Sequence, residues 1–267
     1  MEILQAILLG VIEGLTEFLP ISSTGHLIVA EEYIDFADTA KIFTVAIQSG
    51  AIAAVVWFYR HDIWGKINGL FKSDKVAVQF FINLALATLP AGLLALALES
   101  SFEKFAVPKT VAIASIAGAF VLWWADSKFA AKAHGHKAEI DSIKPKQALI
   151  AGLAQCVALI PGASRSGSAI VGGLLGGMNR VTATAFSFYM AVPILIGAGA
   201  YKLITGRHEL ASVDGGAVSI IVGIAVSFTV ALIVISWLLK YVATHSFKIF
   251  VYYRIALGLL ILLLLYQ

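Results

Sequence analysis

Two glutamates, Glu13 and Glu17, lie in the middle of the apolar stretch that opens this chain of 267 residues. Ionisable side chains at membrane depth are rare and usually line a polar cavity, so they indicate a functional site. The two carboxylates are four residues apart and therefore share one face of a helix. In that arrangement they can share a proton, hold a divalent cation through oxygen ligands, or act as a base toward a nucleophile.

A turn rich in hydroxyl groups follows these glutamates at once. After Pro20 the chain continues with Ser22, Ser23, Thr24, Gly25 and His26. One hydroxyl is enough to cap the helix expected to begin near Gly25, so capping accounts neither for all three hydroxyls nor for the histidine. The free amides of a helix N-terminus bind anions. Histidine, in turn, can take a proton from serine or attack phosphorus itself.

A second polar turn lies in the other half of the chain. Arg165 stands there among small and hydroxyl-bearing residues, namely Gly162, Ser164, Ser166 and Gly167. An arginine buried at membrane depth costs several kcal/mol unless it is paired. Its planar guanidinium suits bidentate recognition of phosphate. We therefore predict that this turn binds an anion; the alternative is that Arg165 only pairs with the glutamates.

The composition places these residues in a membrane. The chain is 60% hydrophobic and 13% charged, with a mean hydropathy of +0.90, whereas soluble domains carry about a quarter charged residues. The net charge of +3 is too small to suggest a nucleic-acid partner. The single cysteine, Cys156, lies in an apolar segment and is expected to pack as a small hydrophobic residue.

Six stretches are apolar over the roughly 20 residues that a spanning helix needs. They are about 40–59, 79–98, 108–125, 182–204, 217–239 and 249–266. Segments 3–29 and 147–176 are broken at Pro20 and Pro161, and each predicts a helix, a turn and a second short helix. Irregular backbone at membrane depth is tolerated only inside protein or beside a watery cavity. We therefore predict a single all-α membrane domain over 1–267, with six transmembrane helices plus two re-entrant helical hairpins.

The loop charges predict the orientation of the domain. Loops 60–78 and 126–146 are rich in Lys and Arg, which marks the cytoplasmic side. Both termini and the acidic loops are then expected outside, with the polar turns opening to the outer face. Arg254, near the inner end of the last span, is expected to extend toward the membrane surface rather than react.

The two broken segments resemble each other. A shift of 142 residues places Ser164 on Ser22 and Gly167 on Gly25. Their opposite entry sides suggest an inverted-topology repeat, with repeat one at about 1–125 and repeat two at about 147–267. In such repeats the site usually lies at the repeat interface near mid-membrane. Chance matching of glycine and serine is the competing explanation.

The two motifs also resemble those of a known family. The stretch from Glu13 to His26 and the stretch from Pro161 to Gly167 are similar to the signature motifs of the bacterial undecaprenyl-diphosphate phosphatases associated with bacitracin resistance. The resemblance covers the whole chain. It implies hydrolysis of a C55 polyprenyl diphosphate to the monophosphate carrier of cell-wall synthesis, in the bacterial plasma membrane. It also implies support by a divalent cation and assigns the reactive positions to Glu13, Glu17, Ser23, His26 and Arg165.

Our mechanistic hypothesis is phosphoryl transfer where the two turns meet. Arg165, the turn amides and one Mg²⁺ or Ca²⁺ held by Glu13 and Glu17 would neutralise the diphosphate. Ser23 would attack, with His26 or a glutamate receiving its proton; attack by His26 itself or by metal-bound water is the alternative. Substrate contacts are expected from Ser22, Thr24, Gly25, Gly162, Ser164, Ser166 and Gly167, and from Gln48 in the next span.

A second class of protein fits the same residues. Inverted repeats and broken helices are typical of secondary transporters, so a transporter or flippase of a phosphorylated lipid is the alternative function. The hydroxyl-rich turn with its histidine favours chemistry, because a carrier needs no nucleophile. The sequence leaves open both a homodimer and the selectivity for tail length.

Overall fold

The computed structural model describes residues 3–34, 36, 42–103, 107–130, 138–205 and 216–265. The regular secondary structure of this part of the chain is helical, as predicted. Its elements are α1 (Ile3–Thr16), α2 (Ser23–Tyr33), α3 (Ile42–Phe58), α4 (Arg60–Phe71), α5 (Lys75–Glu103), α6 (Pro108–Phe129), η1 (Ile140–Ser142), α7 (Pro145–Gln155), η2 (Cys156–Leu159), α8 (Arg165–Leu175), α9 (Arg180–Thr205), α10 (Gly216–Thr244) and α11 (Lys248–Leu264).

Four helices in the described ranges, α5, α6, α9 and α10, are long and apolar enough to cross a membrane. Helix α3 joins α4 at a bend of 73°, and this pair would be a fifth span if it crosses as one unit. The protein is therefore a multi-pass helical membrane protein. The other two predicted spans correspond to α3 and α11, and each of these helices has 17 residues.

The two broken segments have the predicted helix–turn–helix form. Helix α1 ends before Pro20, and α2 begins after the turn. In the second segment η2 ends before Pro161, and α8 begins at Arg165. Proline has no backbone N–H and disfavours helical geometry in the residue before it, so these two residues account for both breaks.

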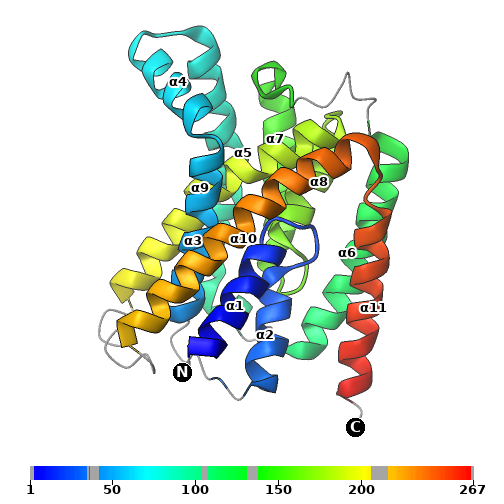
Figure 1. The fold of residues 1–267 in the computed structure, drawn as a ribbon. Coiled ribbons are helices and arrows are strands. Elements are labelled where there is room, and N and C mark those ends of the chain that lie inside the picture. Colours follow the sequence, from blue (N-terminus) through cyan, green and yellow to red (C-terminus); the bar gives the residue numbers. More distant parts are fainter. Residues whose placement is uncertain are drawn as a thin grey trace.

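Small residues allow α1 to lie closely along α10 (Figure 1). A Cβ atom on Gly10 would come within 2.7 Å of the Gly223 carbonyl oxygen, and one on Gly14 within 2.7 Å of the Ser227 carbonyl oxygen. Close backbone approach through small residues is a usual way for membrane helices to associate. Helix α10 also packs on α3, α11 packs on α6, and α8 packs on α7 and α9.

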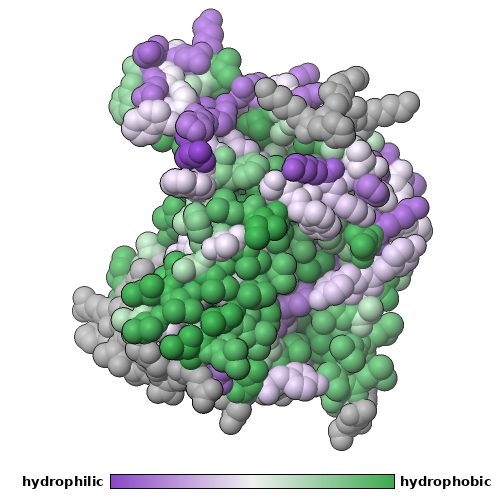
Figure 2. All heavy atoms as spheres, in the orientation of Figure 1, coloured by the Kyte–Doolittle hydropathy of each residue, from purple (hydrophilic) through white to green (hydrophobic). Residues whose placement is uncertain are grey.

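The two ends of the bundle differ in character. Helix α1 begins and α11 ends at one end, while α4 lies at the other (Figure 1). Polar side chains gather around α4, whereas apolar ones cover much of the bundle between the ends (Figure 2). Leu93 of α5, Ile196 of α9 and Ile221 of α10 are each more than half exposed. Such an extended apolar surface is expected where helices face lipid.

Ion pairs and hydrogen bonds fix the end of the bundle that carries α4. Lys66 is buried and pairs with Asp141 of η1 and, at 3.5 Å, with Asp62 one turn earlier in α4. Tyr189 of α9 donates a hydrogen bond of 2.5 Å to the other oxygen of Asp62. These contacts join α4, η1 and α9, and α9 also contributes to the site described next.

Candidate active site

Arg165 and Glu17 form an ion pair between the two turns. Two nitrogens of the guanidinium, Nη2 and Nε, lie 3.2 Å and 3.4 Å from Oε1 of Glu17, although 148 residues separate the pair in sequence. The remaining nitrogen, Nη1, donates to the Ser187 carbonyl of α9 at 3.0 Å. Both side chains are largely buried. The two distant motifs therefore converge as predicted.

Ser23 forms a hydrogen bond with the other oxygen of the Glu17 carboxylate. Its hydroxyl donates to Oε2 of Glu17 at 2.5 Å, and both residues are buried. A hydrogen bond from a hydroxyl to a carboxylate is short and strong. Glu17 is thus in position to accept the Ser23 proton while it holds Arg165.

The hydrogen bonds of His26 go to residues outside this pair. Its Nδ1 donates to the Ser22 carbonyl oxygen at 2.7 Å, and its Nε2 lies 2.7 Å from the Tyr253 hydroxyl of α11. The two rings stack at 5.6 Å between centroids. Because a carbonyl oxygen can only accept, Nδ1 carries a proton, and in the neutral form of the ring Nε2 accepts a hydrogen bond from the Tyr253 hydroxyl. Of the two proton acceptors considered for Ser23, the structure therefore places Glu17, and not His26, on its hydroxyl.

Glu13 is fully buried, and within the described ranges no N–H or O–H group donates a hydrogen bond to either of its oxygens. It lies close enough to Glu17 for the two carboxyl groups to share a proton in a hydrogen bond, and close enough to Arg165 to interact with it electrostatically. An unpaired buried charge is costly, so this carboxyl group is either protonated or holds a ligand. Two carboxylates suit a hard divalent cation. No group of three or more metal-ligating side chains occurs among the described residues, so water or substrate would supply the other ligands.

The two turns share an unusual backbone conformation. Ser22 has φ of 73° and Ser164 has φ of 74°, a region that residues other than glycine seldom adopt. Each serine also accepts a backbone hydrogen bond three residues later, from Gly25 at 3.4 Å and from Gly167 at 3.1 Å. The residues paired by the 142-residue shift thus occupy matching positions in the two turns.

Several predicted substrate contacts have structural roles here. Ser166 donates to the Leu19 carbonyl oxygen at 2.6 Å, which ties the second turn to the first. Gly162 has φ of 93°, and a Cβ atom there would come within 2.5 Å of the Val111 carbonyl oxygen. A Cβ atom on Gly25 would likewise come within 2.8 Å of the Val111 side chain. These glycines are required for close packing, whatever their part in anion binding.

Two other predicted contacts lie less centrally. Thr24 is exposed at the start of α2. Gln48 is half-buried on α3, and none of the hydrogen bonds between described residues connects it to either turn. Their roles toward substrate remain predictions.

The expected position of Arg254 at the membrane surface is wrong. It does not extend to the membrane surface: it is 1% exposed, and its guanidinium lies between the two turns. It donates to the carbonyl oxygens of Pro20 at 3.1 Å, Gly162 at 3.1 Å, Ala163 at 3.0 Å, Ser115 at 3.1 Å and Ala114 at 3.3 Å. Broken helices leave carbonyl groups without donors, and an arginine with five N–H donors satisfies them. The sequence signal for this role is an arginine in an apolar helix of a chain with two buried helix breaks.

The fold and the site together define a multi-pass helical membrane protein with a carboxylate, a hydroxyl and a guanidinium buried where two broken helices meet. A family model described as bacitracin resistance protein BacA matches residues 6–260. The chain belongs to this family, as its motifs indicated.

Curated relatives match over almost the whole chain. One is undecaprenyl-diphosphatase 1 of Paraburkholderia xenovorans (strain LB400), 47% identical over 98% of this chain and 95% of the relative. The undecaprenyl-diphosphatase of Acinetobacter baumannii is 44% identical over 98% of this chain and 95% of its own. The undecaprenyl-diphosphatase of Bordetella pertussis is 40% identical over 98% of this chain and 96% of the relative.

Proposed function

We propose that this protein hydrolyses undecaprenyl diphosphate to undecaprenyl phosphate and inorganic phosphate, recycling the lipid carrier of peptidoglycan synthesis. The observation that carries the proposal is the Glu17 carboxylate, which holds the Ser23 hydroxyl at 2.5 Å and the Arg165 guanidinium at 3.2 Å. Relatives named as diphosphatases, 40–47% identical over nearly the whole chain, support it. The transporter alternative is not favoured, since the matched relatives are named for an enzymatic activity.

In the proposed mechanism, the diphosphate binds to Arg165, which turns part of its guanidinium from Glu17 to the phosphate oxygens. Ser23 Oγ then bonds to the terminal phosphorus while its proton passes to Glu17. The bond from that phosphorus to the bridging oxygen breaks, and the lipid monophosphate leaves. Water hydrolyses the phosphoserine and releases inorganic phosphate. Most of the acceleration comes from positioning and charge neutralisation, as in other phosphoryl transfers.

Glu13 and Glu17 are the residues that would hold a divalent cation, Mg²⁺ or Ca²⁺. The buried oxygens of Glu13, which no donor among the described residues contacts and which lie beside the Glu17 carboxylate, support this assignment. When bound, such a cation neutralises phosphate charge. Glu17 would then serve both the cation and Ser23, which a carboxylate with two oxygens can do.

We also propose the complete architecture of six spans and two re-entrant hairpins in an inverted repeat. Helices α3 and α11, with 17 residues each, extend about 25 Å and approach the ~30 Å hydrocarbon thickness. Helix α1, with 14 residues, and α7, with 11, are too short to cross. The matching turn geometry of Ser22 and Ser164 supports the repeat.

The proposed location is the bacterial plasma membrane, with the site open to the outer face and both termini outside. The end of the bundle that carries α4 holds Arg60, Lys66, Lys72 and Lys75, and basic loops favour the cytoplasm. Helix α1 begins and α11 ends at the opposite end (Figure 1).

The activity is tested with the purified full chain in detergent. Undecaprenyl diphosphate is supplied with Mg²⁺, with Ca²⁺ or with a chelator, and released phosphate is measured. We expect release without any membrane gradient, and none from the Ser23→Ala variant. Absence of release by the folded wild-type protein under every condition would favour the transporter alternative.

A further inference from the structure

The first turn is strained at Ser22, the residue before Ser23. The φ of 73° at Ser22 lies in the left-handed region, which residues other than glycine adopt only where surrounding contacts hold them there. Ser23 follows directly, begins α2 and donates its hydroxyl to Glu17. The direction of the Ser23 hydroxyl therefore depends on the contacts that hold Ser22 in this conformation.

His26 supplies two of these contacts. Its ring Nδ1, at 2.7 Å, and its backbone N–H, at 3.3 Å, both donate to the Ser22 carbonyl oxygen. A carbonyl oxygen has two lone pairs and can accept both hydrogen bonds. In the second turn the 142-residue shift places Ser168 on His26, and there the backbone N–H of Ser168 donates to the Ser164 carbonyl oxygen at 2.9 Å. The imidazole contact is therefore an addition at the turn that carries the proposed nucleophile.

Tyr253 of α11 holds the other side of the imidazole ring. Its hydroxyl lies 2.7 Å from Nε2 of His26, and the planes of the two stacked rings are 10° apart. The hydrogen bond from Nδ1 to the Ser22 carbonyl sets which ring nitrogen carries the proton, so Nε2 of the neutral ring is left to accept from the Tyr253 hydroxyl. Tyrosine hydroxyls in membrane proteins commonly face the head groups, whereas this hydroxyl contacts a residue of the site.

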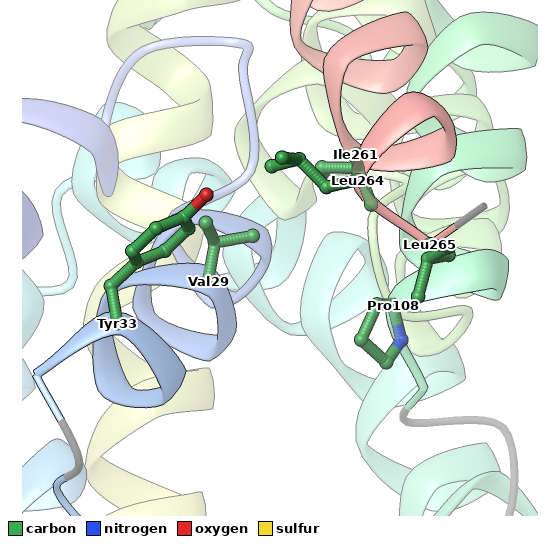
Figure 3. Close-up of a pocket in the computed structure, with 6 residues that line it drawn as sticks. All are labelled: Val29, Tyr33, Pro108, Ile261, Leu264 and Leu265. Carbon is green, nitrogen blue, oxygen red and sulfur yellow. The ribbon is translucent and has the colours of Figure 1, made fainter. Parts of the chain in front are cut away.

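The hydrogen-bonded pair lies where α2 and α11 meet. Farther from Ser23 the two helices are separated by an apolar cavity of about 290 Å³, lined by side chains such as Val29 of α2 and Ile261 of α11 (Figure 3). Arg254, the residue after Tyr253, is buried and holds carbonyl groups of both turns. These contacts fix α11 against the turns, so the Tyr253 hydroxyl reaches the imidazole from a fixed support.

We propose that Tyr253 is a positioning residue for the reaction. Its hydroxyl fixes the His26 ring, the ring holds the Ser22 carbonyl, and Ser22 in turn keeps Ser23 directed at Glu17. In this arrangement Tyr253 acts on the rate only through His26. This inference rests on the proposed function.

The first test removes one hydroxyl at a time from the full chain. Tyr253→Phe keeps the aromatic ring that stacks on His26 but removes the donor to Nε2. Tyr252→Phe is the matched control, because it removes a hydroxyl from the preceding residue of the same helix, which is 68% exposed. Phosphate release from undecaprenyl diphosphate gives kcat and KM for each variant.

We expect Tyr253→Phe to lower kcat about tenfold, because a small displacement of a reacting group slows the chemical step. KM should stay within about twofold of wild type, because Arg165 still binds the diphosphate. The control should keep both constants within about twofold of wild type. Wild-type kcat in Tyr253→Phe, or an equal loss in both variants, would overturn the proposal.

A double variant tests whether the effect passes through His26. His26→Asn retains an N–H donor for the Ser22 carbonyl but has no counterpart of Nε2 to meet the Tyr253 hydroxyl. Adding Tyr253→Phe to His26→Asn should therefore change kcat less than about twofold. A further loss of about tenfold would show that Tyr253 acts independently of the imidazole and would overturn the proposal.

The ring nitrogens can also be observed directly by NMR. The chain has six histidines, and in protein that carries ¹⁵N-labelled histidine the His26 signals are those that His26→Asn removes. We expect a protonated Nδ1 and an unprotonated Nε2 in the wild type. The Nε2 signal should shift in Tyr253→Phe and stay in place in Tyr252→Phe. An Nε2 signal that Tyr253→Phe leaves unchanged would overturn the proposal, even where kcat is too low to compare variants.

Failure of the proposed function gives a different result. In that case the wild-type protein would release no phosphate from undecaprenyl diphosphate, whatever the NMR signals of His26 show.

Discussion

The guanidinium of Arg254 lies 3.1 Å from the Pro20 carbonyl oxygen, although 234 residues separate them in sequence. The same guanidinium donates to Gly162 of the second turn. One side chain from α11 therefore satisfies both helix breaks at once. The site of the proposed reaction is held together by a residue that carries none of its chemistry.

Arg254→Met should destabilise the protein by at least about 3 kcal/mol, because several buried carbonyl groups lose their donor. Thermal unfolding in detergent measures the effect. Lys248→Met is the matched control, since Lys248 is an exposed cation at the start of the same helix. Equal melting temperatures for the two variants would show that Arg254 does not hold the turns.

The contact between the two turns could be predicted from the sequence because their charged residues are stable at membrane depth only in a shared polar cavity. Glu17 and Arg165 are each costly alone at membrane depth, and each compensates the other. The proline positions predicted the helix–turn–helix form of both segments directly. These inferences needed residue type and spacing but no knowledge of which helices are neighbours.

The roles of His26 and Arg254 could not be predicted in the same way. Helical spacing places His26 near Ser23, but the direction of its ring depends on α11, which contributes Tyr253. Among the described residues Arg254 has no acidic partner, and backbone carbonyls stabilise its charge. Every residue has a backbone carbonyl, so the sequence does not show which carbonyls lack a donor. The sequence therefore favoured the membrane surface as the place where Arg254 would be stabilised.

Glu17→Gln should lower kcat for phosphate release by about 100-fold or more, because the amide can neither take the Ser23 proton nor pair with Arg165. Phosphate release from undecaprenyl diphosphate measures this. Glu139→Gln, at an exposed position outside the site, should retain wild-type kcat. Activity of Glu17→Gln within about twofold of wild type would exclude Glu17 as the base.

Glu13→Gln should weaken divalent-cation binding while preserving the fold. A cation that binds the folded protein raises its melting temperature by mass action. We expect Mg²⁺ or Ca²⁺ to raise the melting temperature of the wild type and to have a smaller effect on this variant. Asp74→Asn, an exposed change at the other end of the bundle, is the control. The same cation-induced shift in both variants would argue against a site at Glu13.

Cysteine labelling tests the proposed orientation. In a Cys156→Ala background, Tyr33→Cys and Lys72→Cys place single thiols at exposed positions near opposite ends of the bundle. A membrane-impermeant maleimide should label the first variant in intact cells and the second only after the membrane is disrupted. The reverse pattern would invert the topology and turn the proposed site toward the cytoplasm.

The nucleophile can be identified by trapping the phosphoenzyme from substrate labelled in its terminal phosphate. Since Ser23 donates to Glu17 and the His26 ring nitrogens are engaged by Ser22 and Tyr253, we expect an acid-stable phosphoserine. The label should persist in His26→Asn and disappear in Ser23→Ala. Label that is acid-labile and lost in His26→Asn would make the histidine the nucleophile. If rapid quenching traps no label while phosphate is still released, water attacks directly, and the short bond from Ser23 to Glu17 serves to orient the carboxylate.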